Sequence, residues 1–225
     1  MKTKLFCINR RYILLAAFGI LIFSGLSPNQ LSAQMEATPF VGRGPFFPTN
    51  ADSPMDNDLT SVTGNDKPAQ GEVIELRGTI RDTQGSLVSG AEVLIWQTDN
   101  KCNYDHPDAA KMMGKTALAL DPAFQYWGKT ISDQNGNYFF KTILPIPYLV
   151  ANIQRPAHIH FRVKHPNYKY LTMELHFPDD QYLEDDEITS HLDEEDHVQL
   201  MAKITVPPPG YGNKIAGFNI VLAKK

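Results

Sequence analysis

The feature that most constrains this chain is a series of short segments in which apolar and polar residues alternate. Glu72–Arg81 and Asn137–Thr142 alternate in this way, and turn-forming residues such as Asp133-Gln134-Asn135-Gly136 separate them from their neighbours. A period of two predicts strands with one buried face, and Gly, Asn and Asp between the segments predict tight turns. The other predicted strands are Ala91–Gln97, His158–Lys164, Tyr170–Phe177, Gln199–Val206 and Ile215–Ala223.

Long amphipathic helices are not predicted, because no segment keeps a helical apolar period. A short helix or turn is predicted within residues 107–118, and residues 181–198 are predicted to form an acidic loop. Many short strands joined in this way predict an all-β protein, an antiparallel β-sandwich with long connecting loops. The connection between Gln97 and Ser132 is long for a compact domain, and such loops are usually functional.

The first 34 residues have the layout of a secretory signal peptide. A basic start is followed by the apolar run Tyr12–Phe23 and by the small or polar residues Ser32-Ala33-Gln34. The apolar run is too short for a membrane span, so residues 1–34 are predicted to be removed on export, leaving no membrane anchor. The protein is therefore expected in the periplasm or outside the cell. Arg10-Arg11 also fits a twin-arginine signal, and the export route stays open.

Removal of this leader makes the chain acidic. The leader holds four of the 21 basic residues and none of the 25 acidic ones, which leaves a net charge of −8 (17 − 25). Such a charge argues against binding to nucleic acid or to an anionic membrane. Cys7 is lost with the leader, so Cys102 has no partner for an intrachain disulfide and a hydrophobic core must stabilise the fold.

The mature chain divides by composition into two parts. Residues 35–70 are rich in Pro, Asn, Asp, Ser and Thr and are predicted to form an extended arm or linker, whereas residues 71–225 form the folded domain. Within the arm, Pro45-Phe46-Phe47-Pro48 could pack onto the domain or onto another copy in a homo-oligomer.

Two histidines one residue apart provide the strongest chemical signal. His158 and His160 lie in a predicted strand, so their side chains project from one face, and neutral imidazoles are common metal ligands. Tyr104 and Tyr148 lie upstream in unusual settings. Two phenolates and two imidazoles would form a hard, anionic site that favours Fe(III). Taken singly, these residues fit a polar strand face and packed tyrosines equally well.

Several blocks, taken in order, resemble the intradiol ring-cleavage dioxygenases, and most closely the protocatechuate 3,4-dioxygenase-like (beta-subunit-like) members. The resemblance runs from about Gly71 to Phe177 and includes Leu76–Asp82, Gly90–Asp99 with Tyr104, Asp133–Ile143, Pro147-Tyr148, Arg155–Phe161 and Leu171–Phe177. It implies that residues 71–225 form a catalytic β-sandwich domain. It also implies a mononuclear non-haem Fe(III) bound by Tyr104, Tyr148, His158 and His160, with Tyr148 and His160 axial.

The resemblance further implies a reaction. A catechol-type substrate would displace Tyr148, which accepts one of its protons, and O₂ would cleave the ring to a cis,cis-muconate-type diacid. Arg155 resembles the family arginine that lies against the substrate ring and stabilises negative charge. Glu174 stands where a glutamine is common, and it would either repel an anionic substrate or face solvent. His176 is expected to be structural or exposed, and the acidic run 184–187 to be a solvated loop.

A rival interpretation assigns no chemistry to this chain. Gly78–Thr98 and Asp133–Thr142 also resemble small exported β-sandwich binding modules of the carboxypeptidase-regulatory-like type. Such a module accounts for the first half of the domain but gives no reason for Tyr148, His158 and His160. A second rival keeps the metal but binds another oxygen ligand without ring cleavage.

Overall fold

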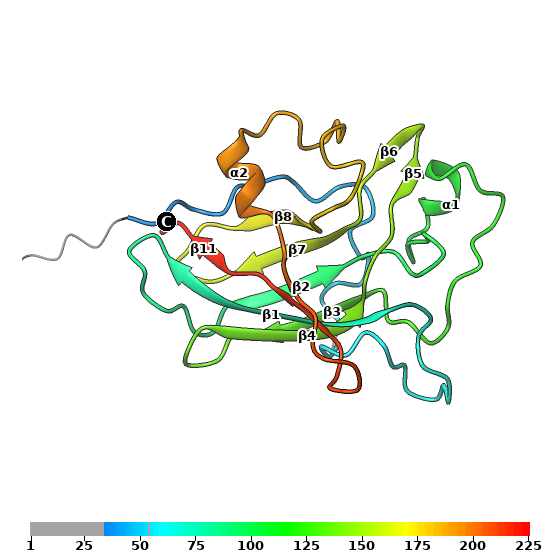
Figure 1. The fold of residues 1–225 in the computed structure, drawn as a ribbon, viewed down its shortest axis with the longest axis horizontal. Helices are drawn as coiled ribbons and strands as arrows, with labels where there is room; N and C mark the ends of the chain where they lie inside the picture. Colours follow the sequence, from blue (N-terminus) through cyan, green and yellow to red (C-terminus); the bar gives the residue numbers. More distant parts are fainter. Residues whose placement is uncertain (1–33, 54) are drawn as a thin grey trace, which may run out of the picture. The chain divides into compact units, whose positions relative to one another are not determined.

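A computed structural model describes residues 34–53 and 55–225 (Figure 1). The predicted signal peptide lies outside these residues, apart from Gln34. The described part of the chain contains two short helices, and none of its helices is long and apolar enough to cross a membrane. The elements are β1 (Val73–Asp82), β2 (Glu92–Trp96), α1 (Ala109–Met112), β3 (Trp127–Ile131), β4 (Asn137–Ile143), β5 (Tyr148–Val150), β6 (Ile153–Arg155), β7 (His158–Lys164), β8 (Leu171–His176), α2 (Glu194–Gln199), β9 (Lys203–Thr205), β10 (Lys214–Gly217) and β11 (Ile220–Leu222).

The strands form two main sheets and a hairpin. In the first sheet β1 is central, with β4 antiparallel on one side and β10 and β11 on the other, and β9 pairs with β10. The second sheet has the order β3-β2-β7-β8 and is antiparallel throughout, and β5 and β6 form a separate hairpin. The all-β sandwich is therefore confirmed.

The predicted antiparallel arrangement is wrong in one place. β1 runs parallel to β10 through Ile74–Arg77 and parallel to β11 through Ile80–Asp82. The chain reverses between β9 and β10, and this reversal gives β10 the direction of β1. The kink at Phe218 and Asn219 separates β10 from β11, where the sequence pattern predicted one strand, Ile215–Ala223.

Alternation along the strands divides the second sheet into two chemically different faces. Ile159, Phe161 and Val163 of β7 join the main hydrophobic core with residues of β1, β2, β4 and β8. The side chains between them, including His158 and His160, point to the opposite face because strand side chains alternate. That face is also buried, since every residue of β8 and all but the last residue of β7 are inaccessible to solvent.

Residues 35–70 cover part of this second face. Phe46 and Ala51 belong to a second apolar cluster with Trp96, Tyr104 and Tyr148. Main-chain bonds fasten the segment at several points, such as Val41 N to Thr172 O at 3.0 Å and Leu59 N to Lys141 O at 2.8 Å. The described part of the segment is extended, but it packs onto the strands and forms one compact unit with them.

Most strand predictions agree with the structure. His158–Lys164 is β7 without a change of boundary, and the short helix predicted within residues 107–118 is α1. The strand predicted at Gln199–Val206 is shortened to β9, because residues up to Gln199 form α2. The acidic loop therefore contains a helix, whose first turn carries three acidic residues and whose N-cap Asp193 accepts a bond from Asp196 N. Acidic side chains in that position stabilise a helix.

Candidate metal centre

The second face of the sheet brings together the four residues singled out in the sequence. His158 and His160 project from β7, and Tyr148 begins β5. Tyr104 lies in the connection after β2, where the Asp99 side chain accepts hydrogen bonds from the main-chain N–H groups of Lys101 and Asn103. This local loop fixes the position of Tyr104, and all four side chains are buried.

The terminal atoms of these residues form a closed ring. Tyr104 Oη lies 3.1 Å from Tyr148 Oη, which lies 3.2 Å from His158 Nε2. The Nε2 atoms of His158 and His160 are 3.3 Å apart, and His160 Nε2 is 3.1 Å from Tyr104 Oη. Ligand atoms bound to one metal ion at about 2 Å, at right angles or wider, lie about 3 Å apart. The four atoms are therefore spaced as ligands of a single ion would be.

Aromatic side chains hold the ring from outside. Trp96 stacks on His160 with centroids 4.7 Å apart and planes 6° apart, and Phe46 stacks on Tyr104 at 4.6 Å. Gly44, at φ +63°, lies so close that an added Cβ would be 3.2 Å from His160 Cε1. Residues 35–70, hereafter the covering segment, thus restrict the positions of both a predicted histidine ligand and a predicted tyrosine ligand.

The two histidines are held in their neutral form. Burial, reinforced by the nearby Arg155 cation, lowers the pKa of His158 to about 3, and burial with the neighbouring His158 lowers the pKa of His160 well below its usual value. His158 Nδ1 lies 2.7 Å from Pro156 O and donates a hydrogen bond to it, so the proton of this imidazole is on Nδ1 and a lone pair is left on Nε2. Neutral imidazoles with a free lone pair are the form that binds metals.

The two tyrosines need a cation before they can lose their protons. Burial and the adjacent Tyr148 raise the pKa of Tyr104 well above its usual value, and burial raises the pKa of Tyr148 as well. A metal ion reverses this effect because it stabilises the bound anion directly. The phenols are therefore neutral unless a cation binds between them.

The donor set fits a metal ion. His160 Nδ1 is buried without a hydrogen-bond partner, and Glu174 Oε1 lies 3.5 Å away, which is long for a hydrogen bond. If the proton of His160 is on Nδ1, facing this carboxylate, then Nε2 of His160 carries a lone pair. This lone pair faces the lone pair on His158 Nε2 at 3.3 Å. A cation between them removes that repulsion. The residues around this point therefore suit a bound cation.

Arg155 lies next to the ring but is bound to two carboxylates. It is the cross-strand partner of Tyr148 in the β5–β6 hairpin. Its Nε donates to Asp186 Oδ1 at 2.9 Å, and its Nη2 donates to Glu174 Oε2. Burial opposes its charge, but Glu174, Tyr148 and Asp186 raise the pKa of Arg155 above its usual value, so the side chain remains a cation. Its predicted role against a substrate ring stays a prediction.

The structure excludes one of the two alternatives for Glu174 and for His176, and it corrects the expectation for the acidic run 184–187. Glu174 does not face solvent, since its β8 position lies opposite His160 and its side chain is 2 % exposed. His176 is buried beside it, and neither ring nitrogen has a hydrogen-bond partner within the described part of the chain. The acidic run 184–187 is not wholly solvated, because Asp186 turns inward to Arg155. Period two along β8 could have revealed Glu174 and His176, but nothing local in the sequence distinguishes Asp186 from its acidic neighbours.

Two other residues considered in the sequence lie at the margin of the centre. His106 makes an edge contact with Phe46, with centroids 5.9 Å apart, and its Nδ1 accepts a bond from Asp108 N. Trp127 is buried in the second apolar cluster with Tyr104 and Tyr148. Neither contributes an atom to the ring.

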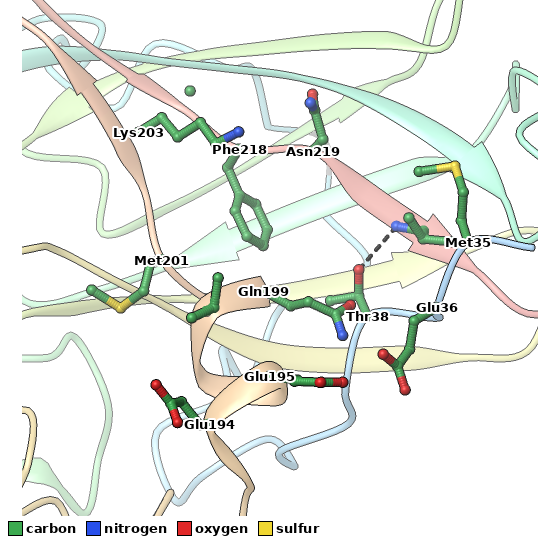
Figure 2. Close-up of a pocket in the computed structure, with 13 residues that line it drawn as sticks. Met35, Glu36, Thr38, Glu194, Glu195, Gln199, Met201, Lys203, Phe218 and Asn219 are labelled. Carbon is green, nitrogen blue, oxygen red and sulfur yellow. Dashed lines mark hydrogen bonds between the residues drawn. The ribbon is translucent and has the colours of Figure 1, made fainter. Parts of the chain in front are cut away.

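Two of the hollows in the described surface bear on access to the centre. One, of about 570 Å³, is lined by Cys102, Lys115, Pro147, Tyr148, Gln154 and Tyr182 among others, and so reaches a predicted ligand. A wider groove of about 830 Å³ lies between the first described residues, α2 and the β10–β11 region (Figure 2). None of the four ring residues lines this groove. The first hollow therefore offers a route toward the centre.

Comparison with known proteins defines the class. A family model described as Dioxygenase matches residues 43–223. The chain belongs to the intradiol ring-cleavage dioxygenase family.

Curated relatives are moderately similar to this chain. Chlorocatechol 1,2-dioxygenase from Rhodococcus opacus is 28 % identical over 159 residues, which cover 64 % of this chain and 58 % of that protein. Catechol 1,2-dioxygenase from Acinetobacter baylyi is 30 % identical over 164 residues, covering 67 % of this chain and 49 % of that protein. The chain thus spans only about half to three fifths of the length of these relatives. The closer likeness to protocatechuate 3,4-dioxygenases stays a prediction.

Solved structures support the fold. The crystal structure of 3-chlorocatechol 1,2-dioxygenase from Rhodococcus opacus 1CP aligns with a TM-score of 0.64 at 19 % identity, covering 87 % of this chain and 75 % of that one. The dioxygenase domain of a dioxygenase carbohydrate-binding protein fusion from Streptomyces sp. SirexAA-E aligns with a TM-score of 0.58 at 23 % identity, covering 84 % and 99 %. At these identities the likeness concerns the fold.

Proposed function

We propose that this protein is a non-haem Fe(III)-dependent dioxygenase that cleaves a catechol-type ring between its two hydroxyl-bearing carbons and uses O₂ to form a cis,cis-muconate-type diacid. One observation carries the proposal: two phenol oxygens and two imidazole nitrogens form a closed ring with sides of 3.1–3.3 Å. Relatives of this chain carry the names of catechol and chlorocatechol 1,2-dioxygenases, which supports the reaction class.

The donor chemistry favours ferric iron. Phenolate oxygens are hard, anionic ligands, and two of them stabilise a trivalent ion better than a divalent one. Bound ferric iron would supply a Lewis acid that holds a catechol as its dianion and makes the ring reactive toward O₂. Tyr104, Tyr148, His158 and His160 would hold it.

The remaining work falls to residues of the chain. Tyr148 lines the hollow of about 570 Å³, so we assign it, as a metal-bound phenolate, the proton of an incoming catechol hydroxyl. Tyr104 is 2 % exposed and has Phe46 stacked on it, so it stays in place while Tyr148 exchanges its proton. Arg155 is the cross-strand partner of Tyr148, and its fixed positive charge stabilises negative charge that develops beside it.

The test combines metal content, colour and oxygen uptake. Iron-loaded protein should contain about one iron per chain, show a tyrosinate-to-Fe(III) absorption band, and consume O₂ with a catechol while forming the diacid. His160→Ala should remove the band and the activity, whereas His191→Ala, at an exposed histidine, should change neither. Ring cleavage that continues unchanged in the His160→Ala protein would refute the assignment.

The non-catalytic binding module is the second candidate, but no observation favours it. A binding module gives no reason for four buried donors from separate segments to converge. Iron content and colour separate it from both metal-binding alternatives, and oxygen uptake then separates an enzyme from a protein that only binds. We further propose that the protein acts after export, which the layout of residues 1–34 supports. Sequencing the amino terminus of the mature protein tests this.

A further inference from the structure

A charged side chain lines the hollow that leads toward the centre. The hollow of about 570 Å³ has a size typical of small-molecule sites, and its wall includes Tyr148, Cys102 and Gln154. Lys115 is the charged member of that wall, and the other residues that line it are apolar or neutral polar. A molecule that enters the hollow on its way to Tyr148 therefore meets a cation and, among the described residues of the wall, no carboxylate.

The main chain around α1 fixes the position of Lys115. Gly114, at φ +64°, ends the helix in a left-handed turn, and Lys115 N then donates to Ala110 O at 2.8 Å. The same helix is fastened to the β5–β6 hairpin, because Ala151 N donates to the main-chain oxygen of the last α1 residue at 2.9 Å. Since Tyr148 begins this hairpin, main-chain bonds connect the lysine to the predicted ligand.

The ammonium group of Lys115 is hydrogen-bonded but not neutralised. Its Nζ donates to Lys101 O, Cys102 O and Asn103 Oδ1 at 3.3, 3.0 and 2.6 Å, and all three acceptors are uncharged. None of the ion pairs that the described residues form includes Lys115. These bonds hold the group in place and leave its positive charge without a partner in the described part of the chain.

The acids of this region do not face the hollow. Asp99 is linked to Lys115 through the side-chain amide of Asn103, but it is 1 % exposed and does not line the hollow. Glu174, the acid that could repel an anionic substrate, does not line it either, and its side chain contacts Arg155. The charge of Lys115 therefore acts directly on a molecule in the hollow.

A carboxylate in the hollow can replace one of the three bonds of Lys115. The bond to Lys101 O is the longest at 3.3 Å, and Lys101 is exposed, so water can satisfy its carbonyl group once the bond is broken. In return Lys115 gains a hydrogen bond in which both partners are charged, and such bonds are stronger than bonds to a carbonyl oxygen. At the half-buried position of Lys115 this exchange should change a binding constant about tenfold.

We propose that Lys115 determines the substrate specificity of the centre by binding a carboxylate on the catechol ring. This inference rests on the proposed function. A catechol whose two hydroxyl groups reach Tyr148 and the other donors presents the opposite edge of its ring to the hollow, because the hollow is the space that Tyr148 borders. A carboxylate on that edge lies on the side of the centre where Lys115 supplies the charge of the described wall.

The test compares two ligands of nearly the same shape, 3,4-dihydroxybenzoate and its uncharged amide, 3,4-dihydroxybenzamide. Their dissociation constants are measured without O₂ by absorbance titration of iron-loaded protein. The wild-type protein should bind the benzoate about tenfold more tightly than the amide, or better. Because each protein is described by the ratio of its two constants, a general loss of iron or ligand affinity cancels.

Three variants locate the preference. Lys115→Gln keeps an N–H donor for the carbonyl groups but removes the charge, so it should reduce the preference about tenfold. Lys115→Arg keeps the charge and should retain most of the preference. Lys111→Gln is the matched control, because Lys111 is an exposed residue of α1 that does not line the hollow, and its ratio should equal that of the wild-type protein.

The outcomes separate this inference from the function on which it rests. Equal affinity of the wild-type protein for both ligands would overturn the inference and leave the enzyme assignment intact, and this result does not depend on any variant folding. A preference that Lys115→Gln alters no more than Lys111→Gln does would also overturn it. If the iron-loaded protein neither binds nor cleaves any catechol, the proposed function itself fails.

Discussion

Phe46 tests whether the covering segment belongs to the folded centre. Its side chain is 3 % exposed and stacks on Tyr104 with centroids 4.6 Å apart, and it makes an edge contact with His106. Removing a buried phenylalanine ring typically costs 3–5 kcal/mol of unfolding free energy. We expect Phe46→Ala to cost about 3 kcal/mol, at the lower end, because the segment can relax over the space that is left.

The measurement is thermal and urea unfolding of the metal-free protein. A loss of about 3 kcal/mol in a domain of this size lowers Tm by about 6–12 °C. Phe40→Ala is the matched control, because Phe40 lies in the same segment but is 58 % exposed, and its loss should change stability by less than about 0.5 kcal/mol. Equal Tm values and urea midpoints for Phe46→Ala and Phe40→Ala would refute the reasoning, because the packing of Phe46 would then add nothing to the stability of the fold. The Phe46→Ala protein should also bind iron less tightly, because Tyr104 is held less firmly. Titration with iron, followed by the absorbance of the charge-transfer band, measures this affinity.

Three further predictions follow from the fold and the centre. Gly78→Ala should prevent folding or cost more than about 4 kcal/mol, because its Cβ would lie 1.6 Å from Phe218 O. A variant that unfolds cooperatively with a loss of less than about 2 kcal/mol in urea would contradict this. Tyr138→Phe should cost about 1–2 kcal/mol, because it removes a buried hydroxyl that donates to Phe218 O at 2.7 Å, and urea unfolding measures it. The metal-free protein should lose stability as the pH is lowered from 6.5 to 4. Folding lowers the pKa of His158 to about 3 and that of His176 to about 4, so in this range the unfolded chain binds more protons than the folded chain. Each histidine should cost up to about 1.4 kcal/mol per pH unit, offset in part by Glu174, whose pKa burial raises; urea midpoints that stay constant over this range would count against it.

Much of the fold was predictable from periodicity. β7 has the predicted boundaries, and β1, β2, β4 and β8 differ by one or two residues, because each alternates clearly between core and outer face. The short strands β5 and β6 were not predicted, since three residues carry too little pattern. β3 was missed as well, because it lies inside the long connection after β2 and its exposed end gives no regular alternation.

The candidate site was predictable where the residue types are unusual for their setting. His158 and His160 share a face because of their spacing, and the resemblance supplied Tyr104 and Tyr148. The partners of Arg155 were not predictable in the same way. Asp186 is one of four consecutive acidic residues, and only the tertiary fold of its loop selects it for burial.

The packing of the covering segment also depends on the tertiary structure. Its composition is that of a linker, and its single apolar side chains have no period. It is ordered because Phe46 finds an apolar surface on the outer face of the sheet and because its main chain bonds to Thr172 and Lys141. Such contacts form between segments that are distant in the sequence, so local pattern does not report them.

The two faces of β7 link the proposed metal centre to the hydrophobic core, and this link limits how the strand can change. Ile159 and Phe161 fill the core, while the histidines on either side of Ile159 reach the opposite face. A single inserted or deleted residue ahead of His158 would exchange the two sets, placing the imidazoles in the hydrophobic core and an aliphatic side chain at the proposed metal centre. We therefore expect this strand to tolerate substitutions at individual positions but not the insertion or deletion of a single residue.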